Sequence, residues 1–247
     1  MKKIINDNFI PLDEKIVIKF FKQLLDAIKY LHDRSIIHRD IIPDNILLDE
    51  NYNVKISEFG ISALIKDNNI LNAKKDRDLF SEYTTKGRLD FVCPEMFTRN
   101  DYDYQADIFP LGLTILYLMS FVKPIIMFKD QFRKSNRYIK KEYMSKYYNE
   151  YLWNLVLRMI DDNDDIRPRA KEALEELEMI EKYIENPEGN EYIKSELDKK
   201  KDLKIIRSNI HIIINTPKST QNNFIYNAFN NNNQGFQNNI FGQNNNN

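Results

Sequence analysis

The chain has 247 residues, a formal net charge of −1 and a single cysteine, Cys93. This length leaves room for one ordinary domain with extensions, and the near-zero charge leads us to expect neither nucleic acid nor a membrane as partner. One cysteine excludes an internal disulfide framework and suits a reducing compartment. The first residues contain no apolar core of the kind found in signal peptides, so we expect an intracellular, cytoplasmic protein.

The first part of the sequence predicts one helix and one β-hairpin. Asp13 is a candidate helix cap, and the helix that follows is expected to run to His32. Its apolar residues recur at helical spacing: Ile16, Phe20, Leu24, Ile28 and Leu31. Two short apolar runs, 46–48 and 54–56, flank the turn-like segment 49–53, and together they predict a hairpin.

From about Tyr104 onward the pattern is helical. The longest apolar stretch, 108–122, is shorter than a membrane span, so we expect a buried core helix. Pro110 would be harmless near the start of this helix and would kink it a few residues further in. A last helix is expected over 169–183. Further core residues are expected at Trp153, Leu155, Val156, Met159 and Ile160. The sequence therefore predicts a mainly α globular unit over residues 1–185, with one short β-hairpin.

The remaining residues divide into two zones. Residues 186–220 are predicted to be a charged, isoleucine-rich linker, in which Pro187 and Gly189 break the helix and Lys199–Lys201 forms a solvated face. The isoleucines of this zone are β-prone, and they would either be exposed or pack back onto the globular unit. Residues 221–247 are rich in Asn and Gln and bury too little apolar surface to offset their ordering entropy, so we expect a disordered, low-complexity tail.

An ordered series of motifs indicates the chemistry. The series consists of H-R-D-I-I-P-D-N at 38–45, E-F-G at 58–60, G-R-L-D-F-V-C-P-E at 87–95, D-I-F-P-L-G at 107–112, and Met159-Ile160-Asp161 followed by Arg167-Pro168. In this order, the motifs are similar to the catalytic loop, the metal-binding D-F-G, the peptide-substrate loop ending in A-P-E, the central buried helix and the closing Arg-Pro of protein kinases. Over residues 4–183 the chain resembles the C-terminal lobe of a eukaryotic-type protein kinase of the serine/threonine-like kind.

The resemblance implies a role for each matching residue. Asp40 would accept the proton of the substrate hydroxyl, and Asn45 would hold Mg²⁺. Arg39 would pair with a phosphorylated activation segment, in which Ser81, Thr84 and Thr85 are the candidate phosphorylation sites. The structural residues would include Glu95 and Arg167, which form a buried ion pair, and Asp107, which braces the catalytic loop. His38 and Phe59 would stack in the hydrophobic column beneath the site, and Gly60 is a further structural residue.

Several positions depart from the family's pattern. The lysine expected two residues after Asp40 is Ile42, and losing one such electrostatic contact typically costs about 10²–10³ in rate. Glu58 stands where an Asp would hold the principal Mg²⁺, and its extra methylene displaces the carboxylate from the geometry that Mg²⁺ requires. Arg88 replaces a Thr, and it would either turn inward to supply the missing charge or lie in solvent. Cys93, in place of an Ala, is expected to be a small buried residue rather than a reactive thiol.

The nucleotide-binding half of a kinase is the largest departure. Only 37 residues precede His38, and the six glycines form no G-x-G-x-x-G. We therefore expect the N-terminal β-lobe to be absent from this chain. ATP and Mg²⁺, the cofactors that the resemblance implies, are then expected to bind weakly if at all. The uncovered face of the lobe would be an apolar patch that needs a protein partner.

Three functions are compatible with these features. The first is a pseudokinase-type scaffold or interaction module with little or no phosphoryl transfer, which Ile42, Glu58 and the missing lobe favour. The second is an active ATP-dependent serine/threonine kinase whose N-terminal lobe is missing from this sequence or supplied in trans, which Asp40 and Asn45 favour. The third is an interaction or condensate-forming protein that acts through the Asn-rich tail. We expect the first, and so a phosphotransferase-family chain that is inactive or strongly impaired on its own.

Overall fold

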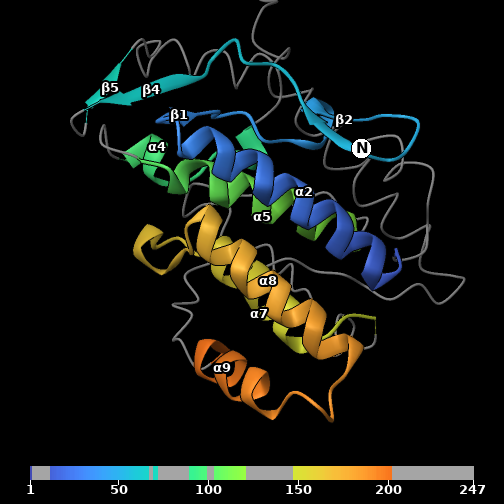
Figure 1. Cartoon of the computed structure of the whole chain (residues 1–247). Coiled ribbons are helices and arrows are strands. Elements are labelled where there is room, and N and C mark those ends of the chain that lie inside the picture. The colour runs from blue at the N-terminus through green and yellow to red at the C-terminus, as the bar shows by residue number, and fades with distance from the viewer. Residues whose placement is uncertain (2–11, 67–68, 72–88, 99–102, 121–146, 202–247) are drawn as a thin grey trace, which may run out of the picture.

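The computed structural model describes residue 1 and residues 12–66, 69–71, 89–98, 103–120 and 147–201 (Figure 1). In this part of the chain helices predominate, and α2 and α5 lie side by side above α7 and α8, with α9 below them. The helices are α2 (Glu14–His32), α4 (Glu95–Thr98), α5 (Gln105–Ser120), α7 (Glu150–Met159), α8 (Ala170–Glu185) and α9 (Glu191–Lys201), with 3-10 turns at Pro43–Asn45, Leu89–Phe91 and Asp164–Ile166.

Helix α2 begins and ends where the sequence predicts. The side chain of Asp13 caps it by accepting a hydrogen bond from the backbone N–H of Lys15, 2.9 Å away, and the last helical residue is His32. The apolar stripe faces the core, although Ile16 at its start is 43% exposed. On the other side of the helix, Lys22 forms an ion pair with Glu181 of α8 at 2.7 Å.

Helix α5 is the centre of the core. Every residue from Ala106 to Ser120 except Tyr117 is buried, which confirms the prediction of a buried helix for the residues described. The helix continues through Pro110, which lies in its second turn and has no N–H to donate. Gly112 allows α7 to approach closely, because a Cβ atom at this position would lie only 2.7 Å from Cγ2 of Ile160.

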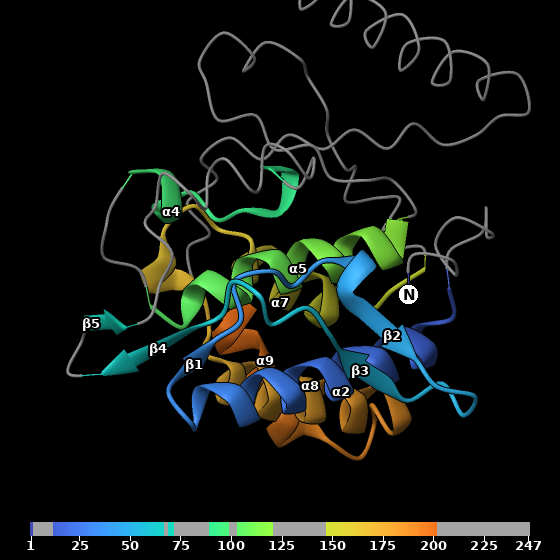
Figure 2. The same ribbon diagram turned by 90° about the horizontal axis from the view of Figure 1, so that it is seen from above.

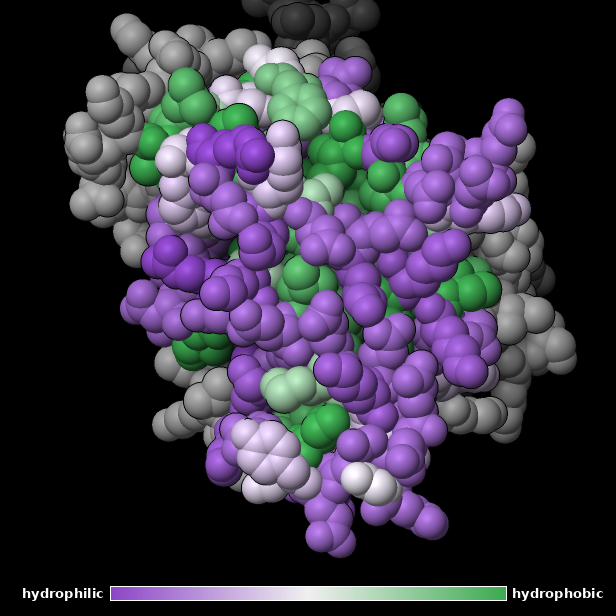
Figure 3. All heavy atoms as spheres, viewed as in Figure 1, coloured by the Kyte–Doolittle hydropathy of each residue, from purple (hydrophilic) through white to green (hydrophobic). Residues whose placement is uncertain are grey.

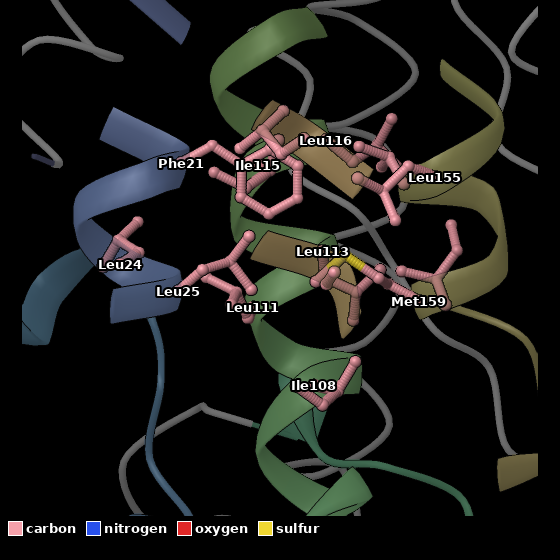
Figure 4. Close-up of a cluster of buried hydrophobic side chains, with 14 of the residues drawn as sticks. Phe21, Leu24, Leu25, Ile108, Leu111, Leu113, Ile115, Leu116, Leu155 and Met159 are labelled. Atoms are coloured by element: carbon pink, nitrogen blue, oxygen red, sulfur yellow. The ribbon is translucent and has the colours of Figure 1, made fainter. Parts of the chain in front are cut away.

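Side chains from three helices meet around α5 (Figure 4). The residues labelled there are Phe21, Leu24 and Leu25 from α2, Ile108, Leu111, Leu113, Ile115 and Leu116 from α5, and Leu155 and Met159 from α7. All the core positions predicted between Trp153 and Ile160 are buried. Burying a large aliphatic side chain typically contributes about 1.5–3 kcal/mol, so this cluster is the main source of stability for the elements that carry the site.

Two small antiparallel sheets lie toward opposite ends of α2 (Figure 2). The predicted hairpin is present as β2 (Ile46–Leu48) and β3 (Val54–Ile56), with Leu47 opposite Lys55. Its second strand is fixed to α2, because the side-chain oxygen of Gln23 accepts a hydrogen bond from the N–H of Val54 at 2.6 Å. The sequence did not predict the other sheet, which has the order β1 (Ile36–Ile37), β4 (Ala63–Lys66), β5 (Asn69–Leu71).

The segment predicted as a linker from residue 186 begins with an ordered turn and a helix. Helix α9 packs against α7 and α8 and buries Leu197. Of the three lysines expected to be solvated, Lys199 is exposed, whereas Lys200 and Lys201 form ion pairs with Glu176 and Glu150. The isoleucine-rich part of the predicted linker and the predicted disordered tail lie outside the described residues.

The face of the molecule that carries α2, α8 and α9 is mainly hydrophilic, with apolar side chains in separate spots (Figure 3). None of the helices in the described part of the chain combines the length and the apolarity needed to cross a bilayer.

Candidate active site

The segment His38–Asn45 connects β1 to β2 and is fixed from below by the carboxylate of Asp107. One oxygen of this carboxylate accepts a hydrogen bond from the N–H of His38 at 2.8 Å, and the other accepts one from the N–H of Arg39 at 2.7 Å. Asp107 lies in the first turn of α5 and is fully buried. Although burial acts to raise its pKa, the hydrogen bonds with the side chain of His32 and the N–H of His38 hold the pKa of Asp107 below its ordinary value. The loop is thus fixed to the rigid centre of the core through a buried, ionised group.

The imidazole of His38 has its tautomer set by its two partners. Its Nε2 lies 3.0 Å from the carbonyl oxygen of Ser57 and donates to it, and its Nδ1 accepts a hydrogen bond from the N–H of Asp40 at 3.2 Å. Burial lowers the pKa of His38, so the ring is neutral. The ring also meets that of Phe59 edge to face, with the centroids 4.7 Å apart. His38 therefore connects the loop to the segment that carries Glu58-Phe59-Gly60.

Asp40 and Asn45 are joined directly. The side-chain nitrogen of Asn45 donates to the Oδ2 atom of Asp40 at 2.7 Å and to its backbone carbonyl at 2.9 Å. Both residues are buried. The structure thus brings together the predicted proton acceptor and the predicted metal ligand, and it leaves the amide oxygen of Asn45 as the atom that could bind a cation.

Two residues of the site have backbone conformations that favour glycine. Arg39 has a φ angle of 67° and Glu58 one of 66°. Such a conformation costs a non-glycine residue about 1–3 kcal/mol and persists where the surroundings enforce it. At Arg39 the restraints are Asp107 on its N–H and the carbonyl of Ile61, which accepts a hydrogen bond from the guanidinium Nε at 2.5 Å.

Ile42 lies in the core rather than in solvent. Its side chain belongs to the main hydrophobic cluster, and the residue is 4% exposed. The neighbouring carbonyl of Ile41 accepts a hydrogen bond from the hydroxyl of Thr114 on α5 at 3.2 Å. The position at which a lysine was expected thus carries a buried alkyl chain, held by a backbone that α5 anchors.

The E-F-G segment lies against the loop but faces outward. Ser57, just before it, donates hydrogen bonds to the carbonyl of Asn45 from its N–H at 2.9 Å and from its hydroxyl at 3.0 Å. Glu58 and Gly60 are exposed, and Phe59 is 49% exposed despite its contact with His38. A Cβ atom at Gly60 would meet nothing within 4 Å.

Glu95 and Arg167 form an ion pair in the interior, at 2.6 Å. The guanidinium of Arg167 also lies 4.7 Å from the ring centroid of Phe109 on α5. Beside this pair, Cys93 is free and fully buried, and burial raises the pKa of its thiol. Arg88 and the candidate phosphorylation sites Ser81, Thr84 and Thr85 lie outside the described residues.

The sequence matches the protein kinase domain family over residues 1–177. This chain belongs to the protein kinase family. The matched kinase region contains the catalytic loop, the E-F-G segment, the Glu95–Arg167 pair and α5, and it ends within α8.

Plant kinases are among the similar proteins. CBL-interacting protein kinase 10 of Oryza sativa subsp. japonica is 33% identical over 167 residues, which cover 67% of this chain and 35% of the relative. CBL-interacting serine/threonine-protein kinase 20 of Arabidopsis thaliana is 32% identical over 186 residues, which cover 73% of this chain and 40% of the relative. CBL-interacting serine/threonine-protein kinase 15 of the same plant is 37% identical over 126 residues, which cover 51% of this chain and 26% of the relative. The chain spans roughly a third of the length of these kinases.

Kinase membership implies ATP and Mg²⁺ as cofactors, and the donor atoms fit Mg²⁺ only in part. The amide oxygen of Asn45 and the carboxylate of Glu58 are hard oxygen ligands of the type that Mg²⁺ prefers. In the described ranges, however, no three His, Cys, Asp or Glu residues come close enough to form a metal site. A bound ion would therefore take Asn45 and Glu58 as its protein ligands and the remainder from phosphate and water.

Two residues of this kinase site were missed by the sequence analysis. His32, the last residue of α2, lies with Nε2 3.0 Å from Oδ2 of Asp107 and with its ring 4.8 Å from that of Tyr104. Thr114 holds the backbone at Ile41. Both make contacts across long sequence separations, and neither belongs to a local motif that could have indicated its role.

Proposed function

We propose that the globular unit is the helical C-terminal lobe of a kinase and that this chain acts as a pseudokinase-type scaffold, with little or no phosphoryl transfer of its own. In the part of the chain that the structure describes, the contacts that hold the catalytic loop are formed, whereas two groups that would bind phosphate and metal, at positions 42 and 58, are altered.

The burial of Ile42 is the observation that carries this proposal. A phosphoryl group in transfer needs positive charge around its oxygens. An alkyl side chain packed in the core supplies none, and Arg39, the nearby cation in the loop, directs its Nε to the carbonyl of Ile61. The loss of one electrostatic contact of this kind typically reduces the rate by about 10²–10³.

Glu58 supports the same conclusion. It is held in a left-handed backbone conformation and exposed to solvent, so its carboxylate is a longer and looser metal ligand than an Asp at that position. Mg²⁺ demands near-ideal octahedral geometry, which makes this change costly for binding.

The scaffold would bind a protein through apolar side chains around the site. Leu47 on the hairpin is 53% exposed and Phe59 is 49% exposed, so both side chains can contribute apolar area to an interface. We infer that a partner covers these side chains.

A second candidate is an active serine/threonine kinase that obtains its nucleotide-binding lobe from elsewhere. The contact between Asp40 and Asn45 favours it, because the proton acceptor and a metal ligand lie together as catalysis would require.

Restoring the altered groups tests the proposal. Transfer of the γ-phosphoryl group of Mg²⁺–ATP to a serine-containing peptide would be measured for the full chain and for its Ile42→Lys, Glu58→Asp double variant. We expect the wild type to remain at background and the double variant to be the faster of the two. Equal rates, both well above background, would overturn the proposal in favour of the active kinase.

A further inference from the structure

Helix α9 lies beyond the residues that match the kinase domain, yet it is part of the folded unit. The match ends at residue 177, and α9 spans Glu191–Lys201. The turn before it is well defined: the side-chain nitrogen of Asn190 donates to the carbonyls of Lys182, at 3.1 Å, and Asn186, at 2.7 Å. A Cβ atom at Gly189 would lie 2.3 Å from Nδ2 of Asn186, so a side chain there would displace the Asn186 amide, whose oxygen accepts a hydrogen bond from the N–H of Gly189 at 3.1 Å. This turn returns the chain onto α7 and α8.

The contacts of α9 with the lobe are mostly polar. The hydroxyl of Tyr151 on α7 donates to Asp198 at 2.7 Å. Nζ of Lys201 lies 2.7 Å from a carboxylate oxygen of Glu150 and 5.8 Å from the ring centroid of Tyr151. Leu197 is the single buried residue of the helix. Ile193 packs partly buried against the core as well, so charged and hydrogen-bonding groups supplement a small apolar contact in the docking of α9.

Lys200 extends a buried ionic cluster between α7 and α8. Arg158 of α7 forms an ion pair with Glu176 of α8, and both side chains are almost fully buried. Nζ of Lys200 lies 3.4 Å from the second carboxylate oxygen of Glu176. Because Arg158 already pairs with Glu176, the cluster keeps a cation when α9 leaves. The base of the lobe can therefore stay folded without the contact to Lys200.

The helix itself has little stability when it is undocked. It has 11 residues and a polar composition, and isolated helices shorter than about 12–15 residues are marginal in water. Docking and folding of α9 are therefore coupled. Segments with few buried apolar contacts and many exposed backbone groups are the ones that open locally in native proteins.

We propose that α9 is a detachable clasp on the base of the kinase lobe. It folds as it docks on α7 and α8, and it opens as a unit while α2, α5, α7 and α8 stay folded. Opening uncovers the ring of Tyr151 and the carboxylates of Glu150 and Glu176. Because the ion pair between Lys201 and Glu150 is partly exposed to solvent, high salt weakens it and favours the open form.

Amide hydrogen exchange of the full chain, followed by mass spectrometry, tests the clasp. The test variant is Lys200→Gln with Lys201→Gln, which removes both ion pairs to the lobe. The matched control is Lys194→Gln with Lys199→Gln, which removes the same charge from exposed positions of the same helix, where Lys199 pairs with Glu196 of α9 itself. We expect exchange over residues 191–201 to be about five- to tenfold faster in the test variant, and nearly unchanged in the control.

Three results would overturn the clasp. Equal exchange over 191–201 in the wild type and the test variant would show that the ion pairs do not hold α9. Equal acceleration in the test and control variants would reflect a general effect of charge on the helix. Acceleration that extends to 150–159 and 170–185 would show that α9 opens only with the rest of the lobe. The wild type in about 1 M salt, where the Debye length falls to about 3 Å, is expected to show a local acceleration over the same residues that is smaller than in the test variant, because the buried Glu176 is screened less.

Discussion

Arg167 binds Glu95 through two parallel hydrogen bonds, from Nη1 at 2.6 Å and from Nη2 at 2.9 Å, across 72 residues of sequence. Nε of Arg167 also donates to the carbonyl of Asp161 at 2.7 Å. The pair fixes the start of α4 to the segment that leads into α8, and Phe109 of α5 lies beside the guanidinium. Because both side chains are almost fully buried, neither charge can be hydrated if the other is lost.

Arg167→Met is therefore expected to be strongly destabilising. Removing one partner of a buried ion pair leaves an uncompensated charge, which typically costs about 3–5 kcal/mol in the free energy of unfolding. Urea unfolding followed by circular dichroism measures this loss. The control is Lys171→Met, because Lys171 is 68% exposed and its pair with Glu175 spans 3.8 Å. A loss below about 1 kcal/mol at Arg167, the range of surface pairs, would contradict the role assigned to the pair.

Two glycine substitutions are expected to have opposite effects. Gly112→Ala should destabilise the fold by about 1–3 kcal/mol, because the added Cβ would lie 2.7 Å from Ile160 and 2.9 Å from Cβ of Met159 in the packed contact between α5 and α7. The better helix propensity of Ala would offset only about 0.8–1 kcal/mol. Gly60→Ala should be neutral or slightly stabilising, since nothing lies within 4 Å of the added atom. Thermal unfolding of both variants measures the contrast, and equal shifts would refute the close approach at Gly112.

The buried imidazole of His38 predicts a loss of stability in mild acid. Burial lowers its folded-state pKa below the ordinary 6.5, so the unfolded chain binds a proton before the folded one does. The contribution of the neutral His38 ring to the free energy of unfolding is constant above about pH 6.5, and it is lost as the pH falls from there toward the folded-state pKa. The urea midpoint of the wild type should therefore fall more steeply between pH 7 and pH 5.5 than that of His38→Gln, which does not titrate. Parallel curves for the two proteins would contradict a neutral, buried His38.

The parts of the fold that the sequence predicts well are set by local patterns. The Asp13 cap, the helix end at His32 and the hairpin at 46–48 and 54–56 follow from capping chemistry and from the spacing of apolar residues within each element. The buried α5 helix follows from its continuous apolar run.

The features that the sequence missed depend on distant partners. Strand β1 has only two residues, which pair with Ala63 and Leu64. A strand this short shows no alternation of apolar and polar residues from which it could be predicted. Helix α9 is highly polar, and its docking depends on single contacts such as Lys200 with Glu176, so its sequence resembles that of a linker.

The residues of the site also divide into those that local motifs indicate and those that only the structure shows. The motifs indicated Asp40, Asn45 and Asp107 through their similarity to kinases, and the structure places these residues together around one loop. His32 reaches Asp107 across 75 residues, and its contribution could be seen only in three dimensions.

The rate of phosphoryl transfer by the full chain, measured against its Asp40→Asn variant, tests the central claim most directly. Asp40→Asn preserves the shape of the side chain and removes the proton acceptor, so it defines the background for Mg²⁺–ATP and a serine-containing peptide. Product can be followed by intact mass spectrometry of the peptide. The scaffold account predicts that the two proteins transfer phosphate at the same background rate. A wild-type rate approaching the roughly 1–100 s⁻¹ of active protein kinases, lost in Asp40→Asn, would contradict it.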